Sequence, residues 1–237
     1  MGITMTYAGF LLGAMAADYY PRLTEVIANK SAAVSLMNDQ AQLCFAIGGP
    51  VLLMLIGWAP WVIRFLYSEE FTPAVGILQW QPVGSTFKLA SWPLGFSLAT
   101  AAKGKTFLFA QINFNVIFLA MTLLGIPSEG LYHGPAFTVA YSINFTLLMI
   151  IVSRSVGYRM APLTRNLLGL HAALSVALLS LAMISAPAGL TAAPVLAVGT
   201  AVFGLRAVLA KTGPDGKVAG RLTTLFDRAG WPIRTAP

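Results

Sequence analysis

Seven long apolar segments limit what this chain of 237 residues can fold into. The segments cover residues 2–17, 41–66, 76–102, 106–126, 134–152, 166–185 and 192–210. A helix needs about 20 apolar residues to cross a hydrocarbon core about 30 Å thick. Because each segment must satisfy its own backbone hydrogen bonds in lipid, the sequence predicts an all-α integral membrane protein with about seven transmembrane helices.

The composition excludes most classes of soluble protein. Apolar residues make up 57% of the chain and charged residues only 10%, whereas an ordinary soluble domain has about 25% charged residues. So few charges cannot cover the surface of a soluble enzyme or of a nucleic-acid-binding domain. The single cysteine, Cys44, excludes a disulfide framework, a cysteine-rich metal site and an iron–sulfur cluster. We therefore expect no nucleic-acid partner, no metal site and no cofactor.

The charges of the loops alternate along the chain. Bases dominate residues 103–105, 153–165 and the tail from residue 206, whereas residues 68–75, 127–133 and 186–191 are acidic or uncharged. Loops rich in Lys and Arg stay on the cytoplasmic side of a membrane. The sequence therefore predicts a chain that starts outside and ends inside, with a transmembrane domain at residues 1–210 and a cytoplasmic tail at residues 211–237.

Two short features flank this predicted domain. Pro21 is expected to end the first helix, beside Asp18 and Arg22, which are spaced for a local ion pair. Residues 218–230 are amphipathic, with their large apolar residues on one helical face. An interfacial helix and a frayed tail both remain open as interpretations of this stretch.

Lys88 is the residue that points most directly to a function. It lies 12 residues after Gly76 and 14 residues before Ala102, which is about 18–21 Å from either end of the predicted helix. A lysine at this depth costs about 2.5–3.5 kcal/mol on insertion scales, and its side chain cannot reach the headgroups. We expect Lys88 to face either a water-filled groove for an anionic substrate or the carbonyl and amide groups of a neighbouring helix.

Three residues share the helical face of Lys88. Gln81, Ser85, Lys88 and Trp92 follow one another at intervals of four, three and four residues. Pro82 lies in the same segment, and such breaks are tolerated in a membrane where the backbone lines protein or water. The face is therefore predicted to line the substrate cavity.

Further polar residues are candidates for this cavity. Arg64, near the outer end of the second segment, is a candidate second cation, although its side chain could instead extend to the headgroups. Gln111 and Asn115 are four residues apart, and Tyr141 and Asn144 are three apart. Each pair is spaced either to line a sugar path or to hydrogen-bond a neighbouring helix.

Motifs for covalent chemistry are absent from the sequence. It contains no Walker A sequence, no HExxH pair and no serine in a nucleophile elbow. Both histidines are isolated, and most acidic residues lie in predicted loops. Because a membrane enzyme needs a cluster of such groups, the sequence favours transport over an enzymatic function.

Several elements of the sequence resemble one family of membrane proteins. The most specific are AMAADYYPRLT at residues 14–24 and FKLASWPLGF at residues 87–96. WVIRFLYS at residues 61–68, FTPA at 71–74 and AKGK at 102–105 extend the match. Over residues 2–159 the chain is similar to the Wzx-type O-antigen and polysaccharide flippases of the multidrug/oligosaccharidyl-lipid/polysaccharide exporter superfamily.

The resemblance implies a fold, a location and a substrate. It implies two helical lobes around a central cavity, in a bacterial cytoplasmic (inner) membrane. It implies the flipping of undecaprenyl-pyrophosphate-linked O-antigen or polysaccharide units, with cations that meet the pyrophosphate, a role suited to Lys88 and Arg64. Implied partners are this lipid-linked oligosaccharide, membrane lipid and the polysaccharide polymerase or ligase machinery. The chain resembles only the second lobe, so we expect it to be truncated.

Two other functions remain open. A multidrug or ion exporter of the same superfamily would need an acidic residue inside a helix, and Asp18, at a predicted interface, is the only candidate near one. A membrane-embedded polysaccharide ligase or glycosyltransferase would need a large outer loop with catalytic residues. Each predicted outer loop is short, the longest being residues 67–75.

Overall fold

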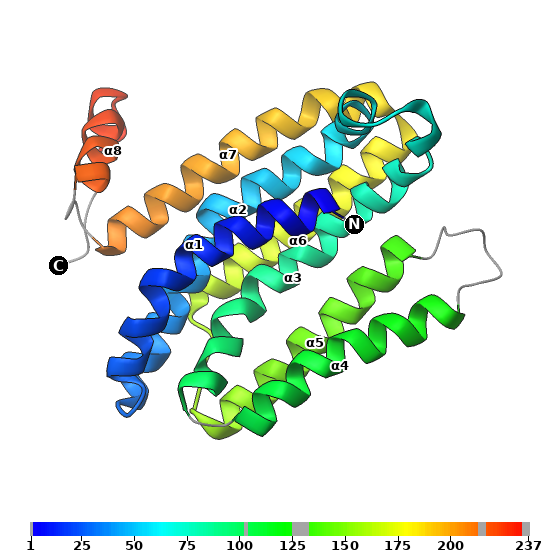
Figure 1. Cartoon of the computed structure of the whole chain (residues 1–237). Coiled ribbons are helices and arrows are strands. Elements are labelled where there is room, and N and C mark those ends of the chain that lie inside the picture. The colour runs from blue at the N-terminus through cyan, green and yellow to red at the C-terminus, as the bar shows by residue number, and fades with distance from the viewer. Residues whose placement is uncertain (1, 102–103, 125–132, 213–216, 234–237) are drawn as a thin grey trace.

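The computed structural model describes residues 2–101, 104–124, 133–212 and 217–233 (Figure 1). Within these ranges the chain consists of α-helices and one short 3-10 helix, with no strand. The elements are α1 (Gly2–Val26), α2 (Lys30–Leu66), η1 (Glu69–Phe71), α3 (Ala74–Thr100), α4 (Gly104–Leu124), α5 (His133–Ser155), α6 (Pro162–Ile184), α7 (Ala186–Thr212) and α8 (Lys217–Arg228). The predicted all-α fold is confirmed.

Five helices of the described chain are long and apolar enough to cross a membrane, namely α2, α4, α5, α6 and α7. α1 and α3 have 25 and 27 residues, which is enough to cross a membrane, but they are not among these five. α3 buries polar residues such as Gln79, Gln81 and Thr86 against its neighbours, and these lower its hydropathy without facing lipid. The helices are those of a multi-pass membrane protein, and the number of seven crossings stays a prediction.

α2 and α3 are the central helices of the bundle. α2 packs against α7, α3 and α6, and α3 packs against α5 as well as α2. α1 contacts both central helices, and α4 packs mainly on α5. Figure 1 shows the α4–α5 pair beside α3 and apart from α2 and α7. α3 is therefore the link between the larger group of helices and the α4–α5 pair.

Small residues bring α2 and α7 into close contact. A Cβ atom added to Gly57 would lie 2.4 Å from the Cβ atom of Ala193 and 2.4 Å from the carbonyl oxygen of Gly189. One added to Gly204 would lie 2.9 Å from the Cα atom of Ala46. Membrane helices associate through such small residues because lipid supplies no hydrophobic force that drives them together. The two helices therefore form one closely packed unit.

The helices near the N-terminus are longer than the sequence predicted. The sequence predicted a break between residues 17 and 41, but α1 continues through Pro21 to Val26 and α2 begins at Lys30. The side chain of Asn29 caps α2 by accepting a hydrogen bond from the Ala32 N–H at 3.2 Å. Hydropathy identifies only the apolar part of a helix that can lie in lipid. The helix itself continues beyond that part where capping and packing stabilise it. The prediction that Pro21 ends the first helix was wrong.

The remaining boundaries lie close to the predicted ones. The largest shift is at the start of α7, which begins at Ala186 rather than at residue 192. The predicted ends at residues 102 and 126 lie outside the described residues, as do Lys103 and Glu129 from the loop-charge argument. The expected ion pair between Arg22 and Asp18 is present at 3.0 Å and is exposed.

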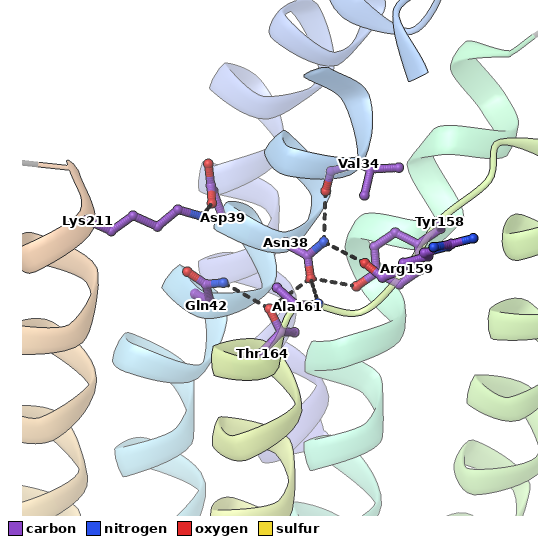
Figure 2. Close-up of polar contacts among 9 residues, drawn as sticks. All are labelled: Val34, Asn38, Asp39, Gln42, Tyr158, Arg159, Ala161, Thr164 and Lys211. Carbon is purple, nitrogen blue, oxygen red and sulfur yellow. Dashed lines mark hydrogen bonds and ion pairs between the residues drawn. The ribbon is translucent and has the colours of Figure 1, made fainter. Parts of the chain in front are cut away.

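Asn38 of α2 is the centre of a buried hydrogen-bond network that the sequence did not reveal (Figure 2). Its Oδ1 atom accepts hydrogen bonds from the Tyr158 hydroxyl at 3.2 Å, the Ala161 N–H at 2.8 Å and the Thr164 hydroxyl at 2.9 Å. Its Nδ2 atom donates to the carbonyl oxygens of Val34 and of Arg159, at 2.9 and 3.0 Å. One side chain, only 3% exposed, thus joins α2 to the segment between α5 and α6.

Neighbouring side chains extend this network. The Gln42 side-chain amide donates to the Thr164 hydroxyl at 2.9 Å, and Asp39 pairs with Lys211 of α7 (Figure 2). Burial raises the pKa of the Tyr158 phenol, so this group stays protonated and remains a donor to Asn38. The network joins α2 and α6 to the α5–α6 connection at one end of the bundle, and the exposed Asp39–Lys211 ion pair adds a contact to α7.

Replacing Asn38 with Leu is expected to destabilise the protein. The Tyr158, Ala161 and Thr164 donors would lose their common acceptor, and buried unsatisfied groups cost about 1–3 kcal/mol each. We expect the free energy of unfolding to fall by about 2–4 kcal/mol, measured by denaturation in mixed micelles with circular dichroism. Asn166→Leu, at an exposed position of α6, is the matched control. An equal loss in both variants would contradict a special role for Asn38.

Candidate functional site

A groove of about 490 Å³ lies between α3, α4 and α5. α3 contributes residues between Lys88 and Phe96, and α4 and α5 contribute the facing side chains. In Figure 1 this is the side on which the α4–α5 pair stands beside α3. The shape of the groove therefore depends on how α4 and α5 pack against α3.

Two glycines hold α5 close to α3 next to the groove. A Cβ atom on Gly84 would lie 2.7 Å from the ring of Phe137, and one on Gly134 would lie 2.6 Å from the Cβ atom of Trp80. The Thr138 hydroxyl also donates to the Trp80 carbonyl oxygen at 3.2 Å. The helices are in close contact along this stretch, and the groove begins one helical turn after Gly84.

Lys88 stands in the middle of α3, 14 residues after Ala74 and 12 residues before Thr100. At about 1.5 Å per residue it is about 18–21 Å from either end of the helix. Its side chain is partly buried, and its Nζ atom lies 5.9 Å from the centroid of the Tyr141 ring. Among the described residues no acidic side chain lines the groove. A cation in this setting favours an anion as ligand.

Amide side chains supply further polar groups to the groove. Asn144 is 6% exposed, and its Oδ1 atom has no hydrogen-bond partner within the described part of the chain. Across the groove on α4, the Asn115 side-chain amide donates to the backbone carbonyl oxygen of Gln111 at 2.9 Å. An unsatisfied buried acceptor costs about 1–3 kcal/mol. A hydroxyl group of a ligand, or a water molecule, would satisfy Asn144.

Aromatic rings form much of the remaining wall. The rings of Trp92 and Phe96 lie with their centroids 4.8 Å apart. Tyr19 of α1 packs against Trp92 at 5.6 Å, and its hydroxyl donates to the carbonyl oxygen of Pro93 at 3.0 Å. Mostly apolar walls with a few placed polar groups are typical of small-molecule sites. The groove is therefore suited to an anion that also carries hydroxyl groups and apolar surface.

The structure brings most of the predicted site residues together. Of the seven candidates, four line the groove, and the pair of residues predicted on the fifth segment lines it too. These are Lys88, Trp92, Gln111 and Asn115, with Tyr141 and Asn144 from α5.

Three candidates lie elsewhere. Gln81 and Ser85 share the face of Lys88, but they are 1% and 2% exposed and do not line the groove. Arg64 is exposed, with its guanidinium 6.0 Å from the centroid of the Trp61 ring, and it does not line the groove either. These three residues therefore lie outside this groove, and their role in substrate binding stays a prediction. Spacing identifies a helical face, but not which turns of that face a neighbouring helix covers.

The sequence reasoning also missed part of the wall. Phe96, Phe107 and Phe114 line the groove, and the only signal for any of them was the position of Phe96 one turn after Trp92. Phenylalanines in apolar segments look alike in a sequence, because each can face lipid, a helix or a cavity.

The described residues contain no set of three or more His, Cys, Asp or Glu side chains that could hold a metal ion. The buried His171 contacts the Leu167 carbonyl oxygen of its own helix at 2.9 Å and stacks on Phe45. It lies outside the groove and has the contacts of a packing residue.

A comparison of the chain with protein-family models, with curated proteins and with solved structures finds no match.

A water-filled groove predicts a specific pattern of thiol labelling. Gln111→Cys lines the groove and should react with a membrane-impermeant thiol reagent, because thiolates form only where water is present. Leu119→Cys, on the exposed apolar side of α4, and Ser85→Cys, at a buried position, should remain unlabelled. The natural Cys44 is fully buried and provides a silent background. Equal labelling at Gln111→Cys and Leu119→Cys, measured by mass spectrometry, would contradict a hydrated groove.

Proposed function

We propose that the chain is the second lobe of a flippase that moves lipid-linked, anionic polysaccharide units across a bacterial cytoplasmic membrane. The observation that carries this proposal is the position of Lys88, halfway along α3 and in a groove of amide and aromatic side chains. Ionisable residues at such depth usually face a pathway or a partner. The proposed ligand is the pyrophosphate and its attached sugars.

The surroundings of Lys88 suit each part of that ligand. The ammonium group matches a phosphate, and the amides of Gln111, Asn115 and Asn144 match sugar hydroxyls. The rings of Trp92 and Phe96 offer flat apolar faces to the sugar rings. A ligand that carries a charge, hydroxyl groups and apolar surface one after another would contact all of these side chains.

The position of α4 supports a substrate with a lipid tail. Its apolar side chains at residues 108, 112, 116, 119 and 123 are each at least 50% exposed and follow one another at helical spacing. The groove thus lies beside a helix whose other face is open to lipid. We propose that the polar head enters the groove while the polyprenyl tail remains in the bilayer, and that movement between helices exposes the head on alternate sides.

The contacts of the most specific sequence elements also support the proposal. The stretch at residues 14–24 and the stretch at residues 87–96 are distant in the sequence but meet in the structure. Tyr19 from the first contacts Trp92 and Pro93 from the second. Of the two stretches that carry the resemblance to the Wzx-type flippases, the second therefore lines the groove and the first packs behind it.

Replacing Lys88 with Gln should abolish most of the transport activity. The amide keeps the shape and hydrogen bonding of the side chain but removes the charge. Because a charged hydrogen bond to phosphate contributes about 1.5–3 kcal/mol, we expect surface polysaccharide to fall at least about tenfold. The measurement uses bacteria whose polysaccharide export depends on the protein that contains this chain.

Two variants make this experiment decisive. Lys105→Gln removes the same charge from an exposed position at the start of α4 and should leave export unchanged. Lys88→Arg keeps the charge at the groove and should retain part of the export. Immunoblots of membranes confirm equal insertion. Normal export in the Lys88→Gln variant would refute the proposed function of the groove.

A further inference from the structure

Arg206 connects the end of α7 to α8 and to the residues that follow it. Its guanidinium lies 5.4 Å from the ring centroid of Phe226 and 5.8 Å from that of Trp231. It also donates hydrogen bonds to the carbonyl oxygens of Trp231 and Pro232. These contacts hold α8 beside the C-terminal end of α7, where Figure 1 shows it apart from the other helices.

A tight turn fixes the C-terminal end of α8. Gly230 has a φ angle of 76°, in the left-handed region that favours glycine. The Trp231 N–H donates to the Phe226 carbonyl oxygen at 3.0 Å, as in a Schellman cap. The turn directs the chain back to Arg206. α8 thus has a defined end and a defined attachment, which a frayed tail would lack.

The side of α8 that does not face Arg206 combines two bases with an apolar residue. Arg221, Leu225 and Arg228 are spaced by four and three residues and therefore share one face. All three are exposed, and Leu225 is 60% exposed. Asp227 lies about 100° from Arg228 around the helix axis, on the side away from Leu225, and is therefore not part of this face. The exposed face therefore carries one apolar side chain with a base on each side of it.

The geometry points to a surface on α8 that binds anionic phospholipids in the plane of the membrane. Arg206 attaches α8 to a membrane-spanning helix, so the bilayer surface is the nearest large partner available to it. Arg221 and Arg228 match lipid phosphates, and Leu225 and the 61% exposed Trp231 match the region between headgroups and acyl chains. An acidic protein would match the arginines but would leave the exposed apolar residues beside the bilayer unexplained.

Hydrogen exchange in nanodiscs tests this surface in the whole chain. One set of nanodiscs contains phosphatidylcholine alone, and the other also contains phosphatidylglycerol. Each base close to an anionic surface adds about fivefold to binding, or about 25-fold for two. We expect the amides of residues 217–228 to exchange at least several-fold more slowly in the anionic nanodiscs, with the other helices unchanged as an internal check on folding.

Two double variants separate the proposed contact from a general effect of charge. R221Q/R228Q should remove the protection that phosphatidylglycerol adds. R154Q/R165Q loses the same amount of charge at exposed positions on α5 and α6. This variant should keep the protection that phosphatidylglycerol adds. Equal exchange in both kinds of nanodisc, or protection that survives in R221Q/R228Q, would overturn the proposal. Protection that appears only when an acidic protein is added would overturn it in favour of a protein partner. Each outcome is independent of the function proposed for the groove.

Discussion

The hydrocarbon core of a membrane offers no hydrogen bonds, so each polar group of this chain that lies there must be satisfied by protein or by enclosed water. The described structure meets this demand in two different ways. Around Asn38 every acceptor and donor of one side chain is used within the protein. In the groove, Lys88 and Asn144 both line the wall, and the buried Oδ1 atom of Asn144 has no hydrogen-bond partner within the described residues. The first arrangement is that of a structural joint, and the second is the one we propose as a binding site.

α3 shows how one helix combines close packing with an open groove. Over its first half Gly84 and Trp80 meet α5 without intervening space. Over its second half, side chains that include Trp92 and Phe96 line the groove. Polar residues in the first half are sealed inside protein, whereas Lys88 lies where the packing opens. The groove therefore lies along the second half of α3, beyond its close contact with α5.

The helices could be predicted from the sequence because lipid imposes a simple rule on apolar length. Their ends near Pro21 and Lys30 could not, since a helix that continues beyond lipid leaves no apolar signal. Lys88 could be identified because a charge at mid-helix is costly wherever it points. Gln81 and Ser85 were predicted to line the cavity because spacing does not show which turns a neighbour covers. Asn38 gave no signal at all, because its partners outside its own helix are more than 100 residues away in the sequence.

The packing also indicates where a transport cycle would require the least disruption. α2 and α7 are joined by small residues in close contact, and the Asn38 network joins α2 to α6. Separating these helices would expose Gly57 and break several buried hydrogen bonds at once. α4, in contrast, packs mainly on α5, less on α3, and exposes most of its surface. Under the proposed function, α5 stays packed on α3, α4 moves relative to α3, and the groove opens and closes at the boundary between α3 and α4. At this boundary the substrate itself would replace contacts that are lost.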